Sequence, residues 1–89
     1  MDQATILERM KAFFVDKTEP EVLERFADTP ATELLEESID VVEFIVYLED
    51  ELGTRIDANK VGPALANMNF GQVAGELSRL LNKEPGANP

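Results

Sequence analysis

The sequence predicts a small all-α protein: a four-helix up-and-down bundle with a long loop between helices 1 and 2 and a short, irregular helix 3. Apolar residues recur at helical spacing, and no segment shows the apolar–polar alternation of a half-buried strand. The 89 residues, 44% of them hydrophobic, suffice for one folded domain. We assign residues 1–82 to this domain and residues 83–89 to a flexible C-terminal tail.

The first half of the chain is predicted to contain one long helix and one short helical turn. The long helix spans residues 3–16, where five apolar residues repeat at helical intervals: Ile6, Leu7, Met10, Phe13 and Phe14. Residues 21–27 (EVLERFA) follow as a helical turn, because Pro20 suits the first position of a helix. Residues 28–32 (DTPAT) are rich in turn-forming residues and are predicted to form a loop.

Three further helices are predicted in the second half. One spans Ser38 to Leu52 and ends at Gly53, a residue typical of the position just past a helix. Residues 61–67 (VGPALAN) are predicted to form a short helix made irregular by Gly62 and Pro63. The last helix is predicted to begin after Asn69 as its N-cap and to reach about Leu81.

The charge distribution excludes several functional classes. The net charge is −10, and residues 33–54 carry eight acids and no base. Such a protein repels nucleic acid and anionic membranes and attracts basic protein surfaces. The chain lacks Cys and His, so it has no disulfide, no Cys or His metal site and no Ser–His nucleophile pair. Calcium binding also fits poorly, because no D-x-D-x-D-G loop is present.

The ends and apolar segments of the chain predict a cytoplasmic location. The first ten residues (MDQATILERM) contain no apolar core of a signal peptide. No apolar run is long enough to cross a membrane. We therefore expect a cytoplasmic protein that makes no contact with membrane or nucleic acid.

A helical-wheel projection of residues 38–52 separates two apolar faces. The wide face, the predicted core side, contains Val41, Val42, Phe44, Ile45, Leu48 and Leu52. Beside it lie two further aliphatic residues, Ile39 and Val46, bracketed by three acids, Glu43, Glu49 and Asp50. Two interpretations remain open at this point. This second face is either ordinary exposed apolar surface, which is common, or a docking strip on which acids attract a basic partner and aliphatic side chains make the contact.

Ser38, at the start of this acidic helix, has three candidate roles. Serine is among the best N-cap residues, and position alone favours that role. A nucleophilic role lacks a histidine to activate the hydroxyl. A third role is an anchor for a phosphate group, since a helix N-terminus offers free N–H groups and a positive dipole end to an anion.

Residues 37–53 (ESIDVVEFIVYLEDELG) resemble the attachment-site region of acyl carrier proteins. Glu37-Ser38-Ile39 stands where that family has Asp-Ser-Leu, and Asp40 matches the acid that follows. The Val-Glu pair at 42–43, the acidic turn at 48–51 and the isoleucine at 56 also match, without a gap. The predicted order of helices agrees over nearly the whole chain, but the resemblance is strong only over residues 34–56.

The resemblance implies that Ser38 carries a 4′-phosphopantetheine group transferred from coenzyme A, flanked by Glu37 and Ile39. Asp40, Glu43, Val46, Glu49 and Asp50 would then contact basic patches of a phosphopantetheinyl transferase and of acyl-loading and synthase enzymes. The protein itself would be a monomeric, non-catalytic carrier in fatty-acid, polyketide or related biosynthesis. The acyl cargo would shelter between the helices, with Phe44, Leu48 and Leu65 as candidate lining residues.

The chain departs from the family pattern at several positions. Glu37 replaces the usual aspartate, Leu35 stands where a small residue is usual, and Ile39 replaces leucine. Arg55 places a cation where the family often has an acid, and Gly62-Pro63 interrupts the third helix. These departures favour a specialised carrier. The alternatives are a peptidyl or aryl carrier protein, and an acidic helical interaction module that is never modified.

Overall fold

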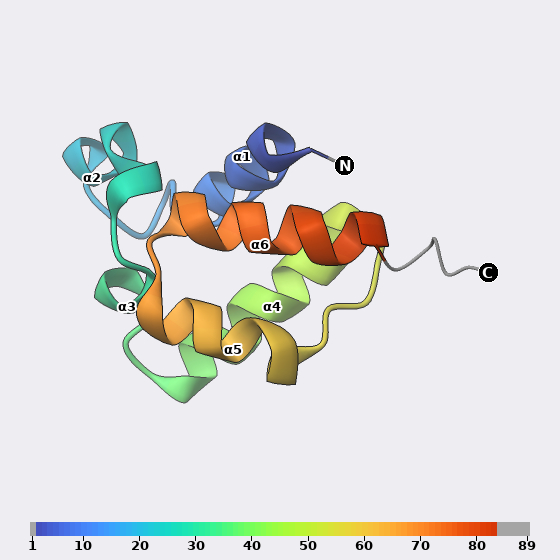
Figure 1. The fold of residues 1–89 in the computed structure, drawn as a ribbon. Coiled ribbons are helices and arrows are strands. Elements are labelled where there is room, and N and C mark those ends of the chain that lie inside the picture. The colour runs from blue at the N-terminus through green and yellow to red at the C-terminus, as the bar shows by residue number, and fades with distance from the viewer. Residues whose placement is uncertain (1, 84–89) are drawn as a thin grey trace.

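The computed structural model describes residues 2–83, with side chains described for residues 2–82, and in that range helices joined by short loops form the protein (Figure 1). The described backbone forms six α-helices, one 3₁₀-helix and a single isolated β-bridge between Pro30 and Asn69. The all-α class is therefore confirmed, whereas the predicted number of four helices is not. The predicted tail, residues 83–89, lies outside the described residues apart from the backbone of Lys83.

The elements run in the order α1 (Gln3–Phe13), α2 (Pro20–Glu24), η1 (Phe26–Asp28), α3 (Ala31–Leu34), α4 (Ser38–Leu52), α5 (Ala58–Asn67) and α6 (Phe70–Lys83). The predicted loop at residues 28–32 is wrong at its end, because Ala31 and Thr32 begin α3. Two long-range hydrogen bonds fix this segment. The Ala31 N–H donates to the Met68 carbonyl, and the Phe70 N–H donates to the Thr29 carbonyl, both at 3.0 Å.

The helix predicted at residues 61–67 is longer and more regular than expected. It begins at Ala58, because the Asp57 side chain caps it by accepting the Asn59 N–H at 2.9 Å. Pro63 lies inside the helix, where it removes one backbone hydrogen bond. Burial of Val61, Ala64 and Leu65 compensates for that loss.

The predicted boundaries of the other two C-terminal helices are close to the observed ones. The α4 helix ends at Gly53, whose φ of 66° lies in the left-handed region that favours glycine. At the start of α6, Asn69 Oδ1 accepts the Gln72 N–H at 2.8 Å, and Gln72 Oε1 accepts the Asn69 N–H at 3.0 Å. This reciprocal pair caps the helix at both residues.

The core lies where α6 packs against α1, α5 and η1, and α4, which passes behind α6 in Figure 1, also packs on α1. Its centre is a group of aromatic rings. Phe14 is 3% exposed, and its ring centroid lies within 5.0–5.7 Å of the rings of Phe13, Phe26, Phe44 and Phe70. This cluster joins the end of α1, η1 and the start of α6 to the acidic helix α4, and so fixes the position of that helix.

Candidate functional site

The N-terminus of α4 is capped by a residue other than Ser38. Glu37 has the extended backbone of an N-cap, and Ser38 is the first helical residue, so the N-cap role considered for Ser38 is wrong. The Glu37 N–H donates to Asp40 Oδ2 at 3.0 Å, and the Glu37 carbonyl accepts the Asp40 N–H at 3.0 Å. Asp40 therefore has the role of the N3 residue of a capping box, whose carboxylate accepts the N–H of the N-cap residue, and the Ser38 side chain takes no part in it.

The Ser38 side chain is exposed and makes no hydrogen bond with any residue that the structure describes. The backbone N–H groups of Ser38 and Ile39 likewise have no acceptor in the described part of the chain. A free hydroxyl thus stands beside two free N–H donors at the positive end of the helix dipole. This arrangement suits an anion attached through, or bound next to, the serine oxygen.

Three aliphatic side chains project into solvent along one side of α4. Ile39, Val42 and Val46 are 57%, 54% and 57% exposed, and we call them the exposed aliphatic strip. Val42 was predicted to face the core, and that prediction is wrong. Its angle on the helical wheel, about 300°, lies at the edge of the apolar arc next to Val46 and Ile39. The strip therefore has three members at i, i+3 and i+7, a continuous line on a helix surface.

The acids around the exposed aliphatic strip differ in whether they form hydrogen bonds or ion pairs within the protein. Glu43 and Asp50 are exposed and form no ion pair within the described part of the chain, and the same holds for Glu37. Asp40 is half-buried and holds the Glu37 N–H. Glu43 and Asp50 are therefore the acids most available to a basic partner.

The Glu49 side chain binds the loop that follows α4. Its side chain is 28% exposed, and its Oε2 atom accepts the Ile56 N–H at 2.8 Å and lies 4.0 Å from Arg55 Nε. On the helical wheel Glu49 lies at about 280°, inside the apolar arc, which is consistent with this half-buried position. We assign Glu49 a structural role, and its predicted contact with a partner stays a prediction.

Replacing Glu49 with alanine is expected to destabilise the fold by about 1–3 kcal/mol, because the Ile56 N–H would be left without its acceptor. The measurement is the free energy of unfolding from urea denaturation. Glu49→Gln, which keeps an acceptor oxygen, should recover most of the loss. The matched control is Asp50→Ala, an exposed neighbour that should change stability by no more than about 0.5 kcal/mol. Equal losses for Glu49→Ala and Asp50→Ala would contradict this role.

Tyr47, for which the sequence suggested no role, packs on α1. Its ring centroid lies 5.0 Å from that of Phe13. Burial raises the pKa of the Tyr47 phenol, and the nearby Glu51 carboxylate raises it further. Glu51 in turn is 3.3 Å from Arg9 of α1. Tyr47 and Glu51 therefore hold α4 against α1, and we assign them no role in partner binding.

A cavity of about 210 Å³ opens directly beside Ser38. Its apolar wall is formed by Leu35, Val41, Leu65 and Ala66, and Gly62 contributes a gap, because a Cβ atom added there would meet nothing within 4 Å. Leu65 was predicted to line such a cavity. Phe44 and Leu48, predicted with it, lie in the core at 1% and 2% exposure and are not part of this wall. The sequence did not identify Gly62 and Ala66, although their i and i+4 positions with Leu65 at i+3 mark one helix face.

The described surroundings of Ser38 contain neither a hydrogen-bonded base nor a cluster of metal-ligating side chains. A serine nucleophile needs a base within hydrogen-bonding reach, and no described side chain hydrogen-bonds to Ser38. Within residues 2–82, no three acidic side chains converge to form a metal site. None of the described helices combines the length and the apolarity that crossing a bilayer requires.

Comparison with known proteins gives no match: no family model, no curated protein and no solved structure is significantly similar to this chain. The function must therefore be inferred from the residues and geometry around Ser38.

Proposed function

We propose that the protein is an acyl carrier protein that bears acyl intermediates as thioesters on a 4′-phosphopantetheine arm attached to Ser38. The observation that carries the proposal is an exposed serine hydroxyl, free of hydrogen bonds to described residues, at the first position of a strongly acidic helix. The longer helices α1, α4, α5 and α6 would form the carrier bundle, with α2 and α3 as short elements of its long connection. We place this carrier in the cytoplasm as a monomer.

The exposed Ser38 hydroxyl at the start of α4 supports this attachment. Ser38 Oγ would give its proton to a base of the transferase and bond to the phosphorus of coenzyme A nearest the pantetheine. The bond from that phosphorus to the bridging oxygen would break, and the nucleotide portion would leave with that oxygen. The product would be a phosphodiester, and the free N–H groups of Ser38 and Ile39 would stabilise its remaining negative charge. The chain has no cysteine, so the attached group supplies the only thiol.

Partner enzymes would dock on the exposed aliphatic strip and the acids beside it. Glu43 and Asp50 are free to attract a basic patch, and Ile39, Val42 and Val46 provide apolar area for the contact. A carrier must leave each enzyme after every visit. A narrow strip guided by charge suits such short-lived complexes, because charge accelerates association without requiring a large buried area.

The cavity beside Ser38 supports a sheltering role for the cargo. Its wall of aliphatic side chains lies next to the attachment oxygen, so an apolar acyl group could lie there out of water. Leu35, an unusual large residue at its position, is 6% exposed and forms part of that wall. This position explains how a bulky residue fits before Ser38.

Two other functions would use Ser38 or the exposed aliphatic strip. A peptidyl or aryl carrier protein would carry an amino or aromatic acid on the same arm. The aliphatic wall of the cavity suits an acyl group, whereas Glu36 and Glu37, which also line the cavity, would attract the ammonium group of an amino acid. An unmodified acidic interaction module would use the exposed aliphatic strip alone. The experiment that separates this module from both carriers is incubation with coenzyme A and a broad-specificity transferase, followed by the mass of the intact protein.

Replacing Val42 with glutamine is expected to lower kcat/KM for loading by the transferase about tenfold, because the strip loses its central apolar contact. Stability should change by no more than about 0.5 kcal/mol, since Val42 is 54% exposed. The matched control is Val15→Gln, which changes a valine of the same 54% exposure after the end of α1 and should load like the wild type. A strong loss of stability in Val42→Gln, or equal loading rates for the two variants, would refute this contact.

A further inference from the structure

A second cavity, of about 290 Å³, lies at the opposite end of α4 from Ser38. It forms where the loop after α4 and the first turn of α5 meet the last turns of α6. The side chains of Ile56 and Leu77 are buried at its floor, and the half-buried Leu80 and Leu81 extend the apolar surface. Neither the attachment site nor the exposed aliphatic strip includes any of these residues.

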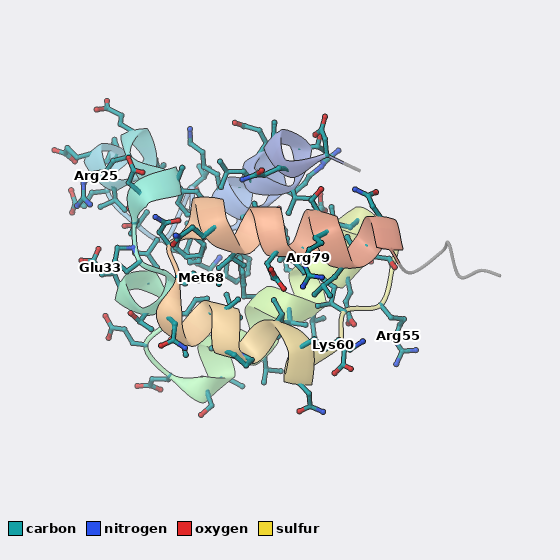
Figure 2. The ribbon with its side chains drawn as sticks, viewed as in Figure 1. Arg25, Glu33, Arg55, Lys60, Met68 and Arg79 are labelled. Carbon is teal, nitrogen blue, oxygen red and sulfur yellow. The ribbon has the colours of Figure 1, made fainter. Side chains whose placement is uncertain are left out.

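Two cations stand at the rim of this cavity, Arg55 and Lys60, and Figure 2 shows both near the C-terminal end of α6. Lys60 forms no ion pair with a described residue. The Arg55 side chain is 97% exposed, and its ion pair with Glu49 uses only Nε, at 4.0 Å. Its terminal nitrogens therefore remain available to a ligand.

Asp57 is the one acid among the described lining residues of this cavity. Its Oδ1 atom accepts the Asn59 N–H at 2.9 Å and caps α5. Arg79, on the adjacent helix α6, is paired with Glu76 (Figure 2 shows Arg79 on α6 above Lys60). In a chain of net charge −10, this cavity combines an apolar floor with two cations and one carboxylate, a local excess of one positive charge. Charge and surface together select a ligand that is apolar at one end and anionic at the other.

We propose that this cavity binds a small amphiphilic carboxylate, an organic acid with an unbranched aliphatic tail of medium length. The tail lies on Leu77, Leu80 and Leu81, and the carboxylate sits between Arg55 and Lys60. The volume of about 290 Å³ is at the small end of ligand cavities, which excludes large ring systems. The proposal goes beyond carrier function and does not depend on it, because the ligand is bound without a covalent bond and away from Ser38.

The test is a titration of the unloaded protein with octanoate at low ionic strength, followed by backbone and methyl NMR. Resonances of Ile56, Leu77 and Leu81 are expected to shift and saturate. Octanol, which lacks the charge, and acetate, which lacks the tail, should bind at least about tenfold more weakly. Added salt should weaken octanoate binding by screening the two cations.

The double variant Arg55→Gln/Lys60→Gln should lower the affinity for octanoate by about tenfold or more. The matched control, Lys11→Gln/Arg25→Gln, makes the same change in net charge at residues far along the chain and should bind like the wild type. The proposal is overturned if Arg55→Gln/Lys60→Gln binds octanoate as tightly as the control. It is equally overturned if octanoate shifts the resonances of Val41 and Leu65 beside Ser38 instead. Neither result would bear on phosphopantetheine attachment, which is measured separately by intact mass.

Discussion

Ser38→Ala is expected to abolish phosphopantetheine attachment completely while leaving the fold intact. The attachment needs an oxygen nucleophile at this position, and alanine has none. Stability should change by no more than about 0.5 kcal/mol, because the Ser38 hydroxyl is exposed and makes no hydrogen bond with any described residue. A helix-capping serine would instead cost about 1 kcal/mol when replaced. Intact mass and urea denaturation measure the two effects on one sample.

The matched control is Ser78→Ala, which changes the other serine of the chain and should accept the group like the wild type. A gain in mass that persists in Ser38→Ala would place the modification elsewhere and contradict the proposed site. A loss of stability near 1 kcal/mol would show that Ser38 contributes to the helix start, against the observed capping by Glu37 and Asp40.

Phe14→Ala is expected to lower the free energy of unfolding by about 3–5 kcal/mol, the typical cost of removing a buried phenylalanine. Phe14 is 3% exposed and packs against four other rings, so few side chains could collapse into the space. A domain of this length has a total stability of roughly 0.05–0.15 kcal/mol per residue, so the loss would be a large share of it. Urea denaturation followed by circular dichroism gives the value.

Val15→Ala is the matched control for this substitution, because Val15 is the next residue in the chain but is 54% exposed. It should cost no more than about 0.5 kcal/mol. Similar losses for Phe14→Ala and Val15→Ala would mean that the aromatic cluster does not hold α1, α4 and α6 together as described.

The acidic helix was predictable because each of its signals is local. Its bounds, Ser38 to Leu52, agree with the structure, and Gly53 caps its end as expected, although the cap at its start is Glu37 and not Ser38. The N-terminus of α6 was predictable for the same reason, since Asn69 and Gln72 cap it through hydrogen bonds three residues apart. Periodic apolar residues and local capping together determine these elements.

The errors arose where distant segments decide the structure. The short helix α3 was missed because Ala31 is held by the carbonyl of Met68, a contact that no local pattern reveals. The predictions for Val42 and Glu49 failed for a related reason: Val42, predicted to be buried, is exposed, and Glu49, predicted to face a partner, is half-buried. The loop at Arg55 and Ile56 covers Glu49 near the end of α4, whereas Val42, near the start, stays 54% exposed. A helical wheel projects the whole helix onto one plane. It therefore cannot represent neighbouring segments that bury a face at one end of the helix and leave the same face exposed at the other.

The candidate site was only partly readable from the sequence. The position of Ser38, the concentration of acids and the aliphatic pair Ile39 and Val46 were visible as patterns within one helix. The cavity beside Ser38 was not, because its wall combines Leu35, the start of α4 and the middle of α5. Gly62 was predicted to interrupt a helix. It lies instead inside the continuous helix α5, where a Cβ atom would face open space.

The most direct measurement is the intact mass of the wild-type protein after incubation with coenzyme A and a broad-specificity phosphopantetheinyl transferase, under conditions in which an established carrier protein is fully loaded. We predict a gain of one phosphopantetheine group per chain, and after trypsin digestion that gain should lie on the peptide from Phe26 to Arg55, at Ser38. No gain in mass, with the established carrier loaded in the same reaction, would contradict the carrier function.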